Sequence, residues 1–138
     1  MSFTNRTAQA LLNSLFGKTS NFGALATVPT IYVALSTTTP NEAGTNVTEP
    51  VGNAYARVAT AAGDWNTATD ADPSVVTNAN SVTFPEASGS WGACTHFVLY
   101  DALTVGNVLG SAALTTPKTP TAGDIPLFPV GALTCSLD

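Results

Sequence analysis

Hydrophobic residues change their spacing near residue 30, and this change predicts which part of the chain is helical. Before it, one apolar stripe with the three- and four-residue spacing of a helix face is formed by Ala8, Leu11, Leu12, Leu15 and Phe16. Thr4 or Asn5 can cap the first turn, and Gly17 stands where a left-handed residue ends a helix. We therefore expect a helix over residues 4–17. A helix this short does not persist alone in water, so the stripe should lie against the rest of the chain or a neighbour.

After residue 30 the pattern becomes that of strands, in which β-branched and aromatic residues alternate with polar ones. The runs that predict strands are 30–37, 55–60, 75–84, 93–100, 107–114, 124–128 and 132–137. Residues 93–100 are apolar on both faces near their end, which favours a central, doubly covered position. Residues 124–128 lie beside Pro126 and Pro129, which favours a sheet edge. The polar loops at 40–54 and 61–74 are rich in turn-forming residues.

These elements predict a mainly β fold. Six to seven short strands separated by Gly, Pro and Asn turns are typical of an antiparallel β-sandwich or a small barrel, here with one N-terminal α-helix. The 138 residues are enough for one hydrophobic core, and no linker or repeat divides them. We therefore expect a single domain over 1–138, with the helix at 4–17 and the β-sandwich at 30–137.

Charged side chains are scarce. They make up 9% of the residues, against roughly 25% in soluble domains. Threonine alone outnumbers the acidic and basic residues together. Neutral residues suit exposed strand faces, which is one explanation. The other is that partners cover much of the surface, because the cores of protein interfaces are depleted of charge. We favour the second.

The charge pattern argues against two kinds of partner. The net charge is −5, and the only cations are Arg6, Lys18, Arg57 and Lys118. Nucleic-acid binding requires clustered cations, so we expect no nucleic-acid partner. We also expect no membrane partner, because no apolar run approaches a bilayer span.

The cysteines are expected to be free. The first residues lack the pattern of a signal peptide, so Cys94 and Cys135 are predicted to be thiols, with a disulfide as the alternative.

Candidate catalytic groups are few. His96 is the only histidine, and Cys94 lies two residues before it. Side chains at this spacing on a strand stand roughly 6–7 Å apart, too far for direct proton transfer. Two ligands are too few for zinc, and Cys135 would add only a third. We therefore expect no enzyme activity, no catalytic residue, no metal and no cofactor.

Two loop features have a structural and a functional explanation. Asp64, Asp70 and Asp72 could hold calcium, but Asx turns explain them more simply, because the spacing is not that of an EF-hand. Trp65 and Trp91 could stack against sugars. Trp91 precedes the central strand and is expected to be a core or rim anchor. Trp65 lies in a polar loop and is the better candidate for an interaction.

The order of these pieces resembles a family of small bacteriophage virion proteins often labelled tail fibre proteins. The resemblance covers nearly the whole chain. It is carried by residues 8–16 (AQALLNSLF), 31–40 (IYVALSTTTP), 41–44 (NEAG), 55–57 (YAR), 82–85 (VTFP), 91–92 (WG), 96–101 (HFVLYD), 114–117 (LTTP), 122–124 (AGD) and 131–134 (GALT). It implies a non-enzymatic virion component with no catalytic residues to carry over, and it does not explain Cys94 or Cys135.

A fibre shaft requires heptads or a triplet repeat, and the chain has neither. We therefore rank a capsid decoration (cement) protein that stabilises the phage head first, and a small tail-fibre or tail-associated component that recognises the host surface second. The expected partners are the major capsid protein or tail proteins and further copies of the chain, for example in a trimer. The expected location is the virion, assembled in the host cytoplasm. The residues predicted to make contacts are Leu11, Leu12, Leu15, Phe16 and Trp65.

Overall fold

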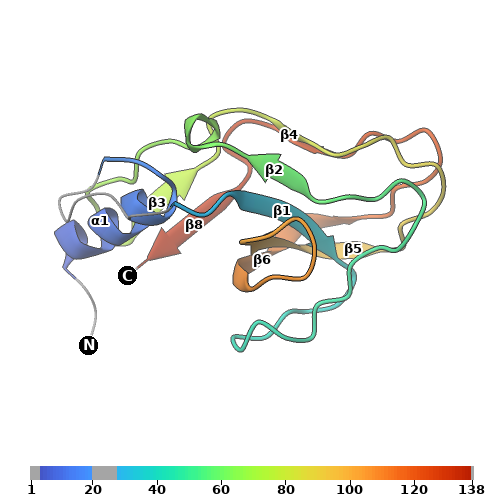
Figure 1. The fold of residues 1–138 in the computed structure, drawn as a ribbon, viewed down its shortest axis with the longest axis horizontal. Coiled ribbons are helices and arrows are strands. Elements are labelled where there is room, and N and C mark those ends of the chain that lie inside the picture. The colour runs from blue at the N-terminus through green and yellow to red at the C-terminus, as the bar shows by residue number, and fades with distance from the viewer. Residues whose placement is uncertain (1–3, 20–27, 138) are drawn as a thin grey trace. The chain divides into compact units, whose positions relative to one another are not determined.

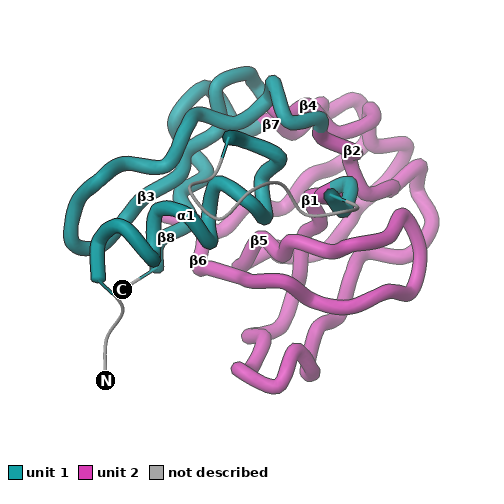
Figure 2. Tube along the Cα trace, turned by 60° about the vertical axis from the view of Figure 1, so that its left-hand side comes forward, with its two compact units in different colours: residues 1–30, 61–81, 128–138 teal, residues 31–60, 82–127 magenta. Residues whose placement is uncertain are grey.

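The computed structural model describes residues 4–19 and 28–137 (Figure 1). The chain forms two compact units, shown in different colours in Figure 2. Unit 1 contains residues 1–30, 61–81 and 128–138, and unit 2 contains residues 31–60 and 82–127. Each unit is therefore assembled from segments that are separated in the sequence. The expectation of a single domain stays a prediction.

The described residues form a mainly β fold with one α-helix at the N-terminal end, as predicted, and its antiparallel sheets are consistent with a small β-sandwich. The helices are α1 (Asn5–Leu15) and the short 3-10 helix η1 (Ala62–Asp64). The eight strands are β1 (Ile31–Ser36), β2 (Val58–Thr60), β3 (Ser74–Thr77), β4 (Val82–Thr83), β5 (Cys94–Tyr100), β6 (Val108–Lys118), β7 (Leu127–Phe128) and β8 (Thr134–Leu137).

The strand predicted at 75–84 is wrong as a single element, because the chain breaks there into β3 and β4. β3 pairs with β8, whereas β4 pairs with β7. Between them the fully buried Asn78 donates to the carbonyls of Asn80 and Pro129, both at 2.8 Å, and accepts from the Leu133 amide at 2.8 Å. A buried amide with its polar atoms satisfied in this way holds the turn in place.

Unit 2 is built on a four-stranded antiparallel sheet in the order β2-β1-β5-β6. β5 lies between β1 and β6, which confirms the central position predicted from its apolar run. On one face, Ala34 and Val98 pair across the strands and form a cluster with Tyr100. β6 continues four residues beyond the predicted end at 114, through Pro117 to Lys118, and is the edge strand of this sheet.

The N-terminal helix begins and ends close to its predicted limits. The Thr4 hydroxyl accepts a hydrogen bond from the Thr7 amide at 3.4 Å. At the other end Gly17 has a φ of +70°. Its amide donates to the Ser14 carbonyl at 3.4 Å, and the Lys18 amide donates to the Asn13 carbonyl at 2.7 Å. These two bonds form a Schellman motif, which requires the left-handed conformation that glycine adopts most easily.

The buried face of α1 overlaps the predicted apolar stripe, because Ala8, Leu12 and Phe16 are buried, but it does not include the whole stripe. The helix packs against β3 and β8, and this contact buries Leu12 and Phe16 but leaves Leu11 40% exposed. Asn13 is buried instead, because its side-chain oxygen accepts from the Ala68 amide at 2.8 Å. The buried face therefore includes a polar residue that hydrophobic spacing does not select.

Candidate functional site

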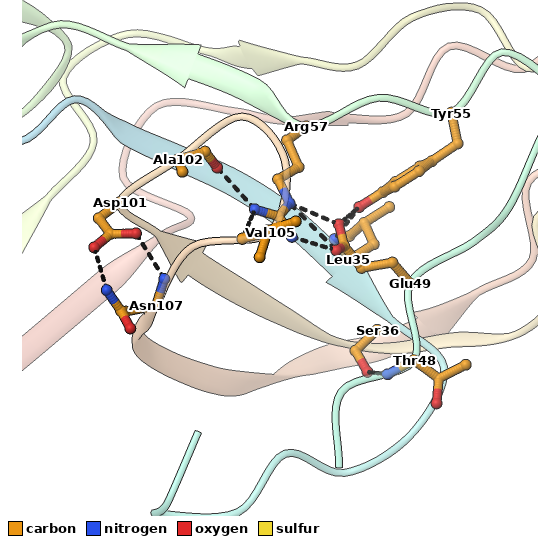
Figure 3. Close-up of polar contacts among 10 residues, drawn as sticks. All are labelled: Leu35, Ser36, Thr48, Glu49, Tyr55, Arg57, Asp101, Ala102, Val105 and Asn107. Carbon is orange, nitrogen blue, oxygen red and sulfur yellow. Dashed lines mark hydrogen bonds and ion pairs between the residues drawn. The ribbon is translucent and has the colours of Figure 1, made fainter. Parts of the chain in front are cut away.

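Arg57, directly before β2, makes the dominant electrostatic contact in unit 2 (Figure 3). Its guanidinium faces the Glu49 carboxylate, with 2.6 Å between Nη2 and Oε2 and 3.0 Å between Nε and Oε1. The Arg57 side chain is only 6% exposed and that of Glu49 22%. A two-pronged contact of this kind is strong and directional, because the planar guanidinium matches the carboxylate.

The same guanidinium holds the loop between β5 and β6, residues 101–107. Its Nη1 donates to the carbonyls of Ala102 at 2.7 Å and Val105 at 2.8 Å (Figure 3). The guanidinium carbon also lies 3.5 Å from the centre of the Tyr100 ring, a cation–π contact. Arg57 therefore ties the loop after β5 to the loop that carries Glu49.

Tyr55 connects this cluster to β1. Its hydroxyl accepts from the Leu35 amide at 3.0 Å and donates to Glu49 Oε1 at 2.8 Å (Figure 3). Burial, together with the nearby Glu49 charge, raises the pKa of Tyr55 far above its usual value, so the hydroxyl keeps its proton. Burial alone would lower the pKa of Arg57, but its hydrogen bonds and attraction to Glu49 raise the pKa overall. The guanidinium of Arg57 therefore keeps its positive charge.

The conformation of the 101–107 loop is tightly specified. Asp101 accepts from the Asn107 amide at 2.7 Å and from the Asn107 side chain at 2.8 Å, and these bonds lower the pKa of Asp101. Val105 has a φ of +56°. This left-handed conformation is a rare outlier for a β-branched residue, and such strain costs roughly 1–3 kcal/mol. The Arg57 contacts and the Asp101–Asn107 closure hold the loop in this conformation.

The strained loop presents two apolar side chains to solvent. Leu103 is 53% exposed and Val105 is 85% exposed, and we call this pair the apolar tip. Rigid loops with exposed apolar residues are typical of protein-contact surfaces, because little ordering entropy is lost when they bind. The arrangement fits a contact with another protein.

The candidate catalytic pair, Cys94 and His96, lies on β5 in two different environments. Cys94 is fully buried, and a bulge in the β5–β6 pairing separates it from the half-buried His96. His96 Nδ1 lies 2.8 Å from the Thr95 hydroxyl. In residues 4–19 and 28–137, no three His, Cys, Asp or Glu side chains are close enough to hold a metal ion. No helix in those ranges is long and apolar enough to cross a bilayer.

Asp64 has the structural role of a turn residue. Its carboxylate accepts from the Ala61 amide at 2.8 Å and from the Asn80 side chain at 2.9 Å. The bond to Ala61, followed by that to Asn80, lowers the pKa of Asp64. Asp64 thus caps η1 by a bond to the backbone three residues before it, which differs from the forward bond of the expected Asx turn.

Both tryptophans lie in cores. Trp91 is 4% exposed, donates from Nε1 to the Asn53 carbonyl at 2.8 Å and contacts the Tyr55 ring edge-on, as predicted for an anchor. Trp65 is 2% exposed, with its ring centre 4.6 Å from that of Phe16. Stacking against an external sugar would require the Trp65 side chain to leave the core of unit 1.

Among the residues predicted to make contacts, Leu12, Phe16 and Trp65 are core residues, whereas Leu11 and the half-buried Leu15 have accessible surface. That these five residues bind partners stays a prediction.

The two cysteines are free, as predicted. Burial raises the pKa of Cys94, and it raises the pKa of the half-buried Cys135 to about 11. Neither thiol is therefore activated as a nucleophile.

The raised pKa values make stability sensitive to alkali. The folded chain favours neutral thiols, so their contribution is complete below about pH 8.5, where an unfolded thiol begins to ionise, and is lost as the pH rises toward 11. We expect the urea midpoint to fall between these pH values. Cys135→Ala should make the fall shallower, because its thiol no longer titrates. Equal slopes for the two proteins would contradict this assignment.

The Arg57 cluster was missed at the level of the sequence, although residues 55–57 were among the segments of the family resemblance. The available signal was the scarcity of charge. Arg57 is one of only four cations and lies inside the run 55–60 predicted as a strand, and an arginine buried in such a position requires a partner. Its acceptors, however, lie as far as 48 residues away and could not be named.

The chain combines a mainly β fold with a loop at residues 101–107 that Arg57 holds in place and that exposes two apolar side chains. The chain belongs to the family described as Podophage GP4 fiber I protein gp80, whose model matches residues 2–136. It is thus a phage fibre-type virion structural protein, which confirms the virion resemblance. No curated protein matches the chain.

Proposed function

We propose that this chain is a non-enzymatic attachment component of the phage particle that contacts other virion proteins through the apolar tip, Leu103 and Val105. The observation that carries the proposal is the strained conformation of Val105, held by Arg57. Strain that the surrounding contacts maintain is most often found at functional sites. Burying the tip against a partner would also remove exposed apolar surface from water.

The family description supports a structural role and favours a position on a fibre or tail. Such a component would contact tail proteins or the host surface. The second candidate is capsid decoration, in which the chain binds and stabilises the phage head. It is supported by the absence of heptads and triplet repeats from the sequence, since a fibre shaft requires one or the other. In both cases assembly would take place in the host cytoplasm.

Copy number per particle separates the two locations. Quantitative mass spectrometry of purified virions, with antibody labelling in the electron microscope, measures both number and position. A few to a few dozen copies on the tail would support the fibre component. Hundreds of copies on the head would support decoration. Absence from purified virions would refute both.

Changing the apolar tip should reduce incorporation into particles. Asparagine tolerates a positive φ, so Leu103→Ser with Val105→Asn removes apolar surface while it keeps the loop conformation. We expect the particle-bound copies to fall by about tenfold, because an apolar contact is replaced by hydrated polar groups. The control is Val130→Asn, at a side chain that is 61% exposed in unit 1. Unchanged incorporation of a folded double variant would contradict the proposed contact.

A further inference from the structure

β6 has an unoccupied hydrogen-bonding edge. It ends the sheet order β2-β1-β5-β6, and no strand in the described part of the chain pairs with its outer side. Its 11 residues span ~36 Å. The opposite edge strand, β2, has only three residues. Short edge strands are one way in which proteins prevent sheet-to-sheet pairing, so the two edges differ in protection.

Most of β6 lacks the features that block a free edge. Residues 108–116 carry no charge, and their central part is composed of the small residues Gly110, Ser111, Ala112 and Ala113. Leu109 is 36% exposed. The protective features lie toward the two ends of the strand: a bulge between Val108 and Gly110 at its beginning, and a second bulge, Pro117 and Lys118 at its end. The centre of the strand, residues 110–113, therefore permits another backbone to approach closely.

The two ends of β6 differ in charge. At the beginning, a hollow of about 380 Å³ is lined by residues 40–44 and 108–111, and Glu42 is the only charged residue in its lining. Gly44, with a φ of +71°, lies so near that an added Cβ would be 3.1 Å from the Val108 Cβ. At the end stands Lys118. Neither Glu42 nor Lys118 forms an ion pair within residues 4–19 and 28–137.

We propose that the free edge of β6 pairs antiparallel with β6 of a second copy of this chain. Antiparallel pairing brings Lys118 of each copy toward the hollow lined by Glu42 in the other copy. The two chains can then form two ion pairs between Lys118 and Glu42. Parallel pairing would instead place like charges at the same end. The neutral centre adds no repulsion, and the two-fold relation is the commonest symmetry of homo-oligomers. This pairing goes beyond the proposed attachment to other virion proteins and does not depend on it.

Sedimentation velocity of the purified full chain over a range of concentrations tests the pairing. We expect a monomer–dimer equilibrium. Ser111→Lys places a charge at the centre of the edge and should raise the dimer dissociation constant by about tenfold or more. Ala59→Lys adds the same charge to the exposed position of β2 and is the matched control, with no expected effect.

A charge exchange tests the direction of pairing. Glu42→Lys and Lys118→Glu should each weaken the dimer by several-fold, and the double variant should recover most of the loss, because the attraction is restored with its sign reversed. Circular dichroism must first show that every variant is folded. A wild-type chain that stays monomeric, forms a trimer, or dimerises regardless of Ser111→Lys would overturn the proposal. Failure of the double variant to recover would overturn the antiparallel arrangement.

Discussion

Replacement of Arg57 by alanine is expected to lower the free energy of unfolding by about 3–5 kcal/mol, because a largely buried ion pair loses one partner. The Glu49 carboxylate would lose its cation at a position where its side chain is only 22% exposed. The carbonyls of Ala102 and Val105 would each lose a donor in the same change. Urea denaturation at pH 7, followed by circular dichroism, measures the difference.

Two further variants make this expectation specific. Arg57→Lys keeps the positive charge but cannot reproduce both prongs of the contact, so its loss should be intermediate. Arg6→Ala removes a cation from the exposed first turn of α1 and should change the free energy of unfolding by no more than about 0.5 kcal/mol. If Arg57→Ala were no more destabilising than Arg6→Ala, the cluster would not contribute to stability as inferred.

Replacement of Trp65 by alanine should lower the free energy of unfolding by a similar amount. The side chain is 2% exposed and contacts the Phe16 ring edge-on. Truncating a buried tryptophan leaves a cavity and typically costs about 3–5 kcal/mol. Thermal and urea unfolding of the variant measure the loss. Phe16 caps the end of α1, so the loss of its contact with Trp65 weakens the packing of the helix. The helical signal in circular dichroism should therefore also fall.

Trp65→Phe provides the matched control. Phenylalanine keeps an aromatic ring beside Phe16 and leaves a smaller cavity, so it should recover much of the lost stability. The result also distinguishes the core position of Trp65 from an external binding role. A Trp65→Ala protein with wild-type stability and reduced adsorption to host cells would contradict the core assignment and support the interaction predicted from its polar loop.

The Arg57 cluster also connects stability with the proposed attachment. Arg57 donates to the carbonyls of Ala102 and Val105, which flank the apolar tip. The contacts that stabilise the fold therefore also fix the conformation of the tip. Loss of these contacts should release the strain at Val105 and allow the loop to sample other conformations, which lowers affinity for any partner that requires this one. We therefore expect the Leu103/Val105 double variant and Arg57→Ala to differ in the free energy of unfolding, but both to reduce incorporation into the phage particle.

Short stretches of the sequence were sufficient to predict the elements that depend on neighbouring residues alone. Thr4 and Gly17 mark the ends of α1 through hydrogen bonds within a few residues. The apolar run of β5 indicated its central place, because a strand covered on both faces needs no polar side. The mainly β class followed from the spacing of strands and turns. These features depend on backbone preference and burial, both of which are visible in a short stretch of chain.

Long-range contacts decided the rest. The break between β3 and β4 depends on Asn78, which reaches Pro129 and Leu133. The place of Asn13 on the buried face of α1 depends on a bond from the Ala68 amide. In the sequence, the scarcity of charge was interpreted as a sign that partners cover the surface. In the structure, two of the few charged residues, Arg57 and Glu49, pair with each other inside the fold. Such partners are chosen by the path of the folded chain, because a hydrogen bond or ion pair depends on distance in space and leaves no periodic trace in sequence.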